Sequence, residues 1–433
     1  MKKQDAYRVF IALSILVDFL FSMIFTASAI YQVTRVGLTP LQLVLVGTTL
    51  ELSIFLFEVP TGVIADIYSR RLSIIIGYFV MGLGFLVGGS FPFFAAMLLA
   101  QVLWGVGYTF TSGATQAWIS DEIGEQNAGR AFLRGNQLGQ ISGLLGILAG
   151  TLLGSLAINL PIQLGGILLI GIGVLLVLVM PEHGFKPTPR EDRNSWQHML
   201  FTFKAGLAVV RQRPALMNIL LIGLFYGLYS EGFDRLWTKH ILDNFTLPLS
   251  DVLQPVVWFG ILRAAGVLLS AGASEIAQRR IRTESFTSVA RSLLGLTVTL
   301  ILCLLVFALT PWLGLAMLAY WVIYVTRNLI GPLYTAWVNQ RLDSGVRATV
   351  ISMSSQVDAI GQIAGGPVVG WVGSAFSVQA ALSASALLLT PILPLYRRAL
   401  RQSGAYHEQD IPADPQPIEN SEANRNHQEG TIL

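Results

Sequence analysis

Five ionisable residues lie near the centres of long apolar stretches of the sequence. They are Asp18, Glu51, Arg263, Arg327 and Asp358. A charge in such surroundings costs about 3 kcal/mol, so each residue is a candidate for binding a proton or another ion. Three acids and two arginines leave one acid without a partner of opposite charge. We expect this surplus acid to bind a proton, and the sequence leaves its identity open among the three.

Each of the three acids has two interpretations. Asp18 is either a carboxylate that takes up and releases a proton, or a permanently ionised partner of Arg263 or Arg327. The same two interpretations apply to Glu51 and Asp358. The two arginines would adjust the proton affinity of these acids or hold an anionic group of a bound molecule.

Further charges lie nearer the ends of the apolar stretches. Glu58 is shallower on one side, and Glu231, Asp234 and Arg235 lie toward the other. Glu231 and Arg235 are four residues apart, which places them on one face of a helix and predicts an ion pair between them. Asp234 is then left over near one mouth of the bundle, where we favour a structural role.

Polar and aromatic residues occur in the same stretches and are predicted to line a cavity with these charges. The set is Gln116, Asn136, Gln137, Gln140, Tyr226, Tyr229, Trp258, Asn328, Tyr334 and Trp337, with Glu231, Asp234 and Arg235. An apolar cavity with a few polar groups suits amphipathic or cationic molecules, which bind by stacking and by cation–π contact. For any single aromatic residue, the alternative is a packing role or an anchor at the membrane surface.

The elements that carry these residues must be transmembrane helices. Hydrophobic residues make up 53% of the 433 residues and charged residues 12%, and the apolar runs have the length that crosses a bilayer. Lipid offers no partner for backbone polar groups, so these runs are predicted to be helical. Twelve spans are predicted, at residues 7–33, 40–65, 72–90, 92–120, 131–158, 160–181, 214–240, 250–275, 286–309, 312–340, 347–371 and 375–396. The first is interpreted as a retained helix and not as a signal peptide.

The spans divide six plus six. We predict an all-α integral membrane protein with an N-terminal six-helix bundle at residues 1–181 and a C-terminal six-helix bundle at 214–400. Residues 182–213 are predicted to form a cytoplasmic central loop with an amphipathic helix over 195–210. The acidic, proline-containing residues 401–433 are predicted to form a disordered cytoplasmic tail.

Lysine and arginine residues gather on one set of connections and predict the orientation. That set includes Lys2, Lys3, Arg8, the basic residues of 186–213 and the cluster at 397–401, whereas the opposite set holds Arg35 and Lys239. By the positive-inside rule, both termini and the central loop are predicted to be cytoplasmic, in an inner (plasma) membrane.

The two halves repeat one arrangement of charges. Asp66 precedes Arg70 and Arg71 after the second span, and Glu275 precedes Arg279 and Arg280 after the eighth with identical spacing. Likewise, Asp121 precedes Arg130 at the start of the fifth span, as Asp343 precedes Arg347 at the start of the eleventh. Duplicated halves are the expected architecture of an alternating-access carrier, with its site between the repeats.

The segment from Gly62 to Arg71 resembles the loop 2–3 signature of the major facilitator superfamily. The resemblance implies the major facilitator fold, with two pseudo-symmetric six-helix bundles, and a gating role for the repeated charges. Arg70 or Arg71 would pair with Asp121, and Arg279 or Arg280 with Asp343. The alternative is that the basic pair only obeys the positive-inside rule.

Two glycine-rich helices favour export. Glycines at 361, 365, 366 and 370 surround Pro367 in the eleventh span, and glycines at 139, 143, 146, 150 and 154 occur in the fifth. Both resemble the glycine-rich helix of drug–proton antiporters, although that family has its proline in the fifth span. Segments 57–62 and 230–237 also resemble bacterial multidrug or macrolide efflux proteins. Small residues at this spacing are equally an ordinary device for close helix packing.

Other functional classes lack their residues. No nucleotide-binding loop of the Gly-x-x-x-x-Gly-Lys-Ser/Thr kind occurs, and the five histidines have no metal-ligand spacing. Cys303 is the single cysteine. We therefore expect no enzyme activity, no cofactor, no metal site and no nucleic-acid partner.

Our leading hypothesis is a secondary active transporter that exports small amphipathic compounds in exchange for protons, by alternating access. Its partners would be the small-molecule substrate, protons and the lipid bilayer, and it would act as a monomer. One alternative is proton-coupled uptake of a small, anionic metabolite, favoured by the two central arginines. An alternative of another class is a non-transporting membrane sensor or scaffold that retains the fold.

Overall fold

The computed structural model describes residues 3–187, 214–281, 285–340 and 344–409. These residues form helices and no strand. The N-terminal half comprises α1 (Lys3–Thr34), α2 (Pro40–Ile67), α3 (Arg70–Ser90), α4 (Phe94–Ile123), α5 (Glu125–Leu156) and α6 (Leu160–Val179). The C-terminal half comprises α8 (Pro214–Asn244), α9 (Pro255–Arg280), α10 (Phe286–Leu309), α11 (Leu313–Asn339), α12 (Ser344–Ala375), α13 (Val378–Leu388) and α14 (Ile392–Gln409). The amphipathic helix expected at 195–210 lies outside the described residues.

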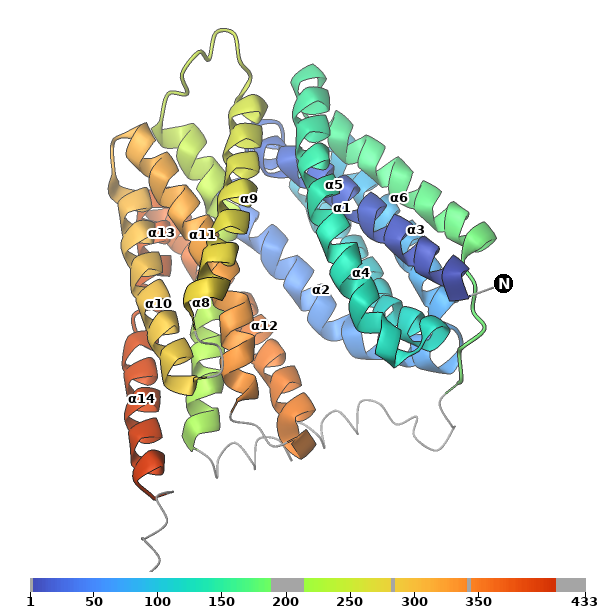
Figure 1. Cartoon of the computed structure of the whole chain (residues 1–433). Coiled ribbons are helices and arrows are strands. Elements are labelled where there is room, and N and C mark those ends of the chain that lie inside the picture. Colours follow the sequence, from blue (N-terminus) through green and yellow to red (C-terminus); the bar gives the residue numbers. More distant parts are fainter. Residues whose placement is uncertain (1–2, 188–213, 282–284, 341–343, 410–433) are drawn as a thin grey trace, which may run out of the picture.

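Ten segments of the described residues are long and apolar enough to cross a membrane, and α13 and α14 together form one of them. The predicted seventh and eleventh spans correspond to α8 and α12, which carry Glu231, Asp234, Arg235 and Asp358. The protein is therefore an all-α integral membrane protein with twelve transmembrane helices in two bundles (Figure 1).

Short polar signals set the helix ends. The side chain of Thr39 accepts a hydrogen bond from the backbone of Gln42, whose side chain accepts one in return, and Pro40 opens α2. The side chain of Ser69 caps α3 by accepting a hydrogen bond from the backbone N–H of Leu72. Gly124 joins α4 directly to α5 with a φ of 86°, a conformation that favours glycine. These tight connections hold the charges at the helix ends close together.

Glycines let paired helices approach closely inside each half. On α5, a Cβ added at Gly146 or Gly150 would overlap the backbone of α1 at Phe19 or Met23. On α12, a Cβ at Gly361 or Gly365 would overlap the backbone of α8. The pair α1 and α5 therefore corresponds to the pair α8 and α12, as expected for two repeats of one design.

The last helix is longer than the sequence predicts. Residues 401–409, predicted to belong to a disordered tail, continue α14 to Gln409. The first proline after this helix is Pro412, so nothing in residues 401–409 removes a backbone donor and stops the helix. The rest of the predicted tail lies outside the described residues.

The two halves touch at one end of the molecule, here called the opposite end, where α2 begins and α12 ends. The backbone N–H of Leu41 donates to Oγ of Ser374 over 2.9 Å, and Gly154 of α5 packs against Val256 of α9. The other end carries Arg70, Arg71, Arg279 and Arg280 and is called the basic end. Figure 1 shows α5 and α9 side by side at the top, with the halves diverging below them.

Candidate functional site

A central cavity of about 950 Å³ lies between the two halves. α2 contributes Glu51 and Glu58, α8 contributes Glu231, Asp234 and Arg235, and Arg263 and Asp358 come from α9 and α12. Trp104 and Tyr108 of α4 and Gln362 of α12 add aromatic and amide groups. Four of the five central charges predicted from the sequence therefore lie in or beside this cavity, and Asp18 does not.

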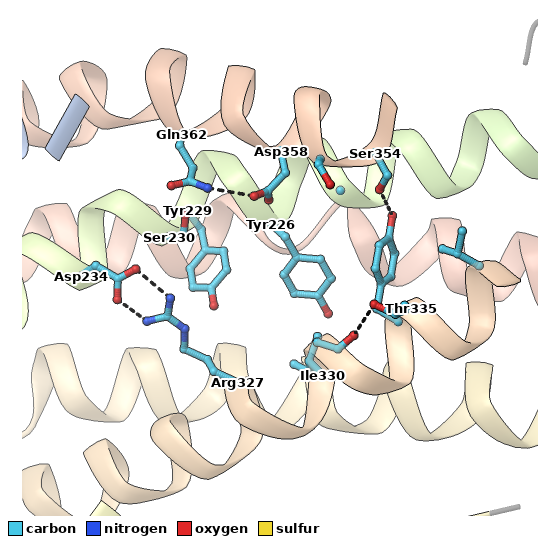
Figure 2. Close-up of a pocket in the computed structure, with 15 residues that line it drawn as sticks. Tyr226, Tyr229, Ser230, Asp234, Arg327, Ile330, Thr335, Ser354, Asp358 and Gln362 are labelled. Atoms are coloured by element: carbon cyan, nitrogen blue, oxygen red, sulfur yellow. Dashed lines mark hydrogen bonds and ion pairs between the residues drawn. The ribbon is translucent and has the colours of Figure 1, made fainter. Parts of the chain in front are cut away.

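Each arginine of the cavity region has a partner. Arg327 forms a bidentate ion pair with Asp234, in which Nη2 lies 2.8 Å from Oδ2 (Figure 2). Its guanidinium also lies 5.7 and 5.5 Å from the ring centres of Tyr229 and Phe233, within cation–π range. Arg235 pairs with Glu231 over 3.2 Å, as their spacing of four residues predicts. Asp234 is thus engaged by Arg327 and is not left over.

Arg263 has a different partner from the one expected. Its Nη1 donates to the backbone carbonyl of Phe25 in α1 over 2.6 Å, which is a contact between the two halves. Among the described residues, Arg263 and Arg327 have other partners, and neither forms the ion pair with Asp18 that the second interpretation expects.

The remaining acids of the cavity differ in their surroundings. The carboxylate of Asp358 accepts a hydrogen bond of 2.8 Å from Nε2 of Gln362, one turn further along α12. Glu51 projects from α2 into the same cavity, and within the described part of the chain its carboxylate has no hydrogen-bond or ion-pair partner. The surplus acid expected from the sequence thus has a structural candidate in Glu51.

A second pocket, of about 450 Å³, opens beside Asp358 inside the C-terminal half. It shares Asp234, Ser355, Asp358 and Gln362 with the central cavity. Figure 2 shows Tyr226 and Tyr229 pointing from α8 toward α11 in this pocket. Tyr334 closes one end, where its hydroxyl donates to the carbonyl of Ile219 over 2.7 Å. We call this space the tyrosine pocket.

Several residues predicted to line a cavity lie elsewhere. Trp337 is buried in the core of the C-terminal half, stacked on Phe286 with 5.3 Å between ring centres. Nε1 of Trp258 donates to the carbonyl of Pro248 in the connection before α9. The predicted residues that line neither the central cavity nor the tyrosine pocket also include Gln116, Gln137, Gln140 and Asn328, all exposed, and Asn136.

The repeated charges of the N-terminal half form a cluster at the basic end. The guanidinium of Arg70 pairs with Asp121 at the end of α4 and lies 3.6 Å from Asp66 at the end of α2. Arg70, and not Arg71, thus contacts Asp121. Nη2 of Arg71 donates instead to the carbonyl of Val177 in α6 over 2.6 Å. We call Asp66, Arg70, Arg71 and Asp121 the Arg70 cluster. It joins α2, α3, α4 and α6 of one half.

Sequence reasoning missed two acids beside this cluster. Glu182 accepts hydrogen bonds from Oγ of Ser69 over 2.6 Å and from the backbone of Arg71 over 2.8 Å. Glu122 accepts two bonds of 2.6 Å from the backbone after α6, at His183 and Gly184. Both acids follow the end of a predicted span by one or two residues, and this position was the available signal. They anchor residues 181–185, the post-α6 segment, to the bundle.

The corresponding charges of the C-terminal half are less enclosed. Arg279 pairs with Glu275 over 2.6 Å, and the side chains remain 76% and 58% exposed. Arg280 is exposed, as is Arg130 at the start of α5. Asp343 lies outside the described residues, as does the side chain of Arg347, so their expected contacts have no structural description. Gly62 of the signature segment faces open space.

Metal-binding groups of the usual composition are absent from the described ranges, where no three His, Cys, Asp or Glu residues gather. The candidate site therefore consists of paired charges, two cavities and the free carboxylate of Glu51. Such an arrangement can bind a small molecule and exchange protons.

Comparisons with known proteins agree with this architecture. An uncharacterized MFS-type transporter of Bacillus subtilis (strain 168), YxaM, is 25% identical over 359 residues, which cover 82% of this chain and 86% of YxaM. The crystal structure of a mutant of the nucleoside transporter NupG superposes with a TM-score of 0.71 at 15% identity, covering 92% of this chain and 99% of the NupG chain.

A bacterial homologue of the human lysosomal transporter Spinster, in an inward-facing and unoccupied conformation, also has a TM-score of 0.71, at 14% identity over 91% and 97% of the two chains. At such identities the solved structures show a shared fold alone. The family model of the Major Facilitator Superfamily matches residues 10–366, most of the chain. The protein is therefore a membrane transporter of the Major Facilitator Superfamily.

Proposed function

We propose that this transporter exports small amphipathic, preferentially cationic compounds in exchange for protons. The observation that carries the proposal is the unpartnered carboxylate of Glu51, which, among the described residues, faces the same cavity as Asp358. A carboxylate in such a cavity is stabilised by either a proton or a cationic substrate, and it cannot hold both. Competition for one carboxylate is a direct way to couple the two movements.

The charge balance of the cavity supports this choice of substrate. Arg235 and Arg327 are neutralised by Glu231 and Asp234. Among the described residues, Glu51, Glu58 and Asp358 then face a single remaining arginine, Arg263. The excess of negative charge favours a cation, and the tyrosine pocket offers aromatic faces for its apolar part.

Alternating access is the mechanism that the two-bundle fold supports. With the basic end in the cytoplasm, the contact between α2 and α12 at the opposite end closes the outer side. Rocking of the halves would open that contact and close the basic end. Each half carries charges at this end: the Arg70 cluster in the N-terminal half and the pair of Arg279 with Glu275 in the C-terminal half. Each would then contact the other half and act as a gate.

A second candidate is uptake of an anionic metabolite. Arg263 is the observation that favours it, because this guanidinium lines the cavity with a neutral carbonyl as its hydrogen-bond partner. A carboxylate or phosphate could replace that carbonyl. The candidate ranks second because the other arginines are already neutralised.

Proton movement in everted vesicles tests the proposal. Addition of a transported cationic dye should release protons from the vesicle lumen, whereas symport would move protons in the other direction. Glu51→Gln should abolish the coupled movement. Glu58→Gln is the matched control, since it changes the same side chain on the same helix seven residues further along. Normal proton release by Glu51→Gln would overturn the assignment of Glu51, and release of equal size without any substrate would overturn coupled export.

A further inference from the structure

The N-terminal half contains a pocket that the central cavity does not include. It has a volume of about 230 Å³ and lies between α1, α3, α4 and α5. Its lining includes Ser14, Asp18, Tyr78, Thr115 and Asn136, and none of its lining residues lines the central cavity. We call it the Asp18 pocket.

Two polar groups in this pocket lack partners. Across the described residues, the carboxylate of Asp18 and the hydroxyl of Tyr78 form no hydrogen bond and no ion pair. Tyr78 as a residue is 4% exposed, and neither its hydroxyl nor the Asp18 carboxylate is among the fully buried unpaired atoms, so both groups open into the pocket. Two unpaired oxygen-bearing groups that open into one pocket leave acceptor atoms free for an occupant of that pocket.

The sequence makes room for Asp18 with glycines. A Cβ at Gly139 of α5 would overlap Oδ2 of Asp18. A Cβ at Gly135, one turn earlier, would lie 2.9 Å from Oγ of Ser14. Gly135 and Gly139 therefore leave space for the side chains of Ser14 and Asp18. The glycines at 143, 146 and 150 let α5 pack closely on α1.

The oxygen atoms around the pocket match a hard cation. Oγ of Ser14 and Oγ1 of Thr115 donate their protons to backbone carbonyls of their own helices, over 3.0 and 2.7 Å. Their lone pairs remain free to accept, as do the carboxylate oxygens of Asp18. Carboxylate, hydroxyl and amide oxygens are the ligands that hard cations prefer.

We propose that the Asp18 pocket binds a monovalent cation, sodium. One carboxylate balances one positive charge, whereas a divalent ion would leave an excess charge at membrane depth. Since one water molecule occupies about 30 Å³ of liquid, the pocket has room for the ion and several waters. Sodium there would bridge α1 to α4 and α5 without touching the substrate in the central cavity. The inference stands apart from the proposed function, because it requires no particular substrate or direction.

Binding and thermal stability of the purified full-length protein test the inference. The melting temperature should rise with sodium chloride concentration and not with choline chloride at equal ionic strength. At ten times the dissociation constant, bound sodium favours the folded state about elevenfold. Equilibrium binding of radioactive sodium should saturate at one ion per chain. Asp18→Asn should abolish both effects, and Tyr78→Phe, which removes one oxygen atom, should weaken binding.

Glu51→Gln is the control that separates this inference from the proposed function. It should keep the sodium effect while it loses proton coupling. Equal stabilisation of wild type and Asp18→Asn by sodium would overturn the inference. The inference would also be overturned if sodium did not stabilise the wild type and Asp18→Asn changed only how stability depends on pH. That result would assign the pocket to a proton.

Discussion

Replacing Gly370 with alanine should weaken the contact that closes the opposite end. Gly370 of α12 faces α2 across the two halves. A Cβ at this position would lie 3.0 Å from Cβ of Val44 and 3.1 Å from Cα of Leu41. The backbone of Leu41 cannot rotate away as a flexible side chain would, so the added methyl group requires α2 and α12 to shift apart by a few tenths of an ångström.

The magnitude follows from overpacking. An extra methyl group in a close-packed contact costs about 1–3 kcal/mol. This cost falls on the conformation with the closed opposite end and disappears when α2 and α12 separate. At about 1.4 kcal/mol for each factor of ten, the equilibrium between the two conformations should shift by about 5- to 150-fold.

Cysteine accessibility measures this shift. Cys303 is the single cysteine, so Cys303→Ser followed by Ser352→Cys leaves one thiol, in the central cavity. A membrane-impermeant thiol reagent is applied to vesicles of each orientation. Adding Gly370→Ala should raise labelling from the opposite end, up to saturation, and lower it from the basic end.

Two other glycines provide controls. A Cβ at Gly365 would overlap Leu228 within the same half, so Gly365→Ala should lower thermal stability without changing the side of labelling. A methyl group added at Gly295, inside α10, would have no atom of a neighbouring helix within 4 Å, so Gly295→Ala should leave the side of labelling unchanged and should not lower thermal stability, since alanine is the better helix former by about 0.5–1 kcal/mol. If Gly370→Ala labels like the wild type from both sides, the contact between α2 and α12 does not set the conformational equilibrium.

Three further substitutions test the charge pairs and the post-α6 segment. Asp234→Asn leaves the guanidinium of Arg327 without its bidentate ion-pair partner. Because both side chains are partly exposed, the free energy of unfolding should fall by about 1–3 kcal/mol in a thermal unfolding assay. An unchanged melting temperature would contradict a structural role for the pair. Trp118→Phe removes the donor for the carbonyl of Pro181, 2.6 Å away, and should cost about 1–3 kcal/mol in the same assay, where no change would mean that water replaces the indole. Asp66→Asn changes an exposed carboxylate and should reduce transport while stability falls by less than about 1 kcal/mol; wild-type rates at normal expression would argue against gating.

The sequence was sufficient for the fold because the bilayer leaves few alternatives. Apolar length, lysine and arginine asymmetry and the repeated charges each reflect a constraint that acts along the chain. The ion pair between Glu231 and Arg235 was predictable for the same reason, since both residues lie on one helix face.

Contacts between helices were not predictable in this way. Arg327 and Asp234 lie 93 residues apart, and their pairing depends on how α8 and α11 pack. For Asp18, the sequence predicts a position along the helix but not which way the helix is rotated, and Asp18 faces α5 instead of the central cavity. Trp337 was misplaced for the same reason, because an aromatic residue on a transmembrane helix suits a core as well as a cavity.

The post-α6 segment determines where the N-terminal half ends as a unit of assembly. Trp118, Glu122 and Glu182 hold residues 181–185 against the ends of α3 and α4. When the gene is divided into two co-expressed fragments, a first fragment that stops at Val179 would lack these bonds. One that stops after Lys186 would keep them, and it should be the version that inserts stably and reassembles with a second fragment beginning at Pro214.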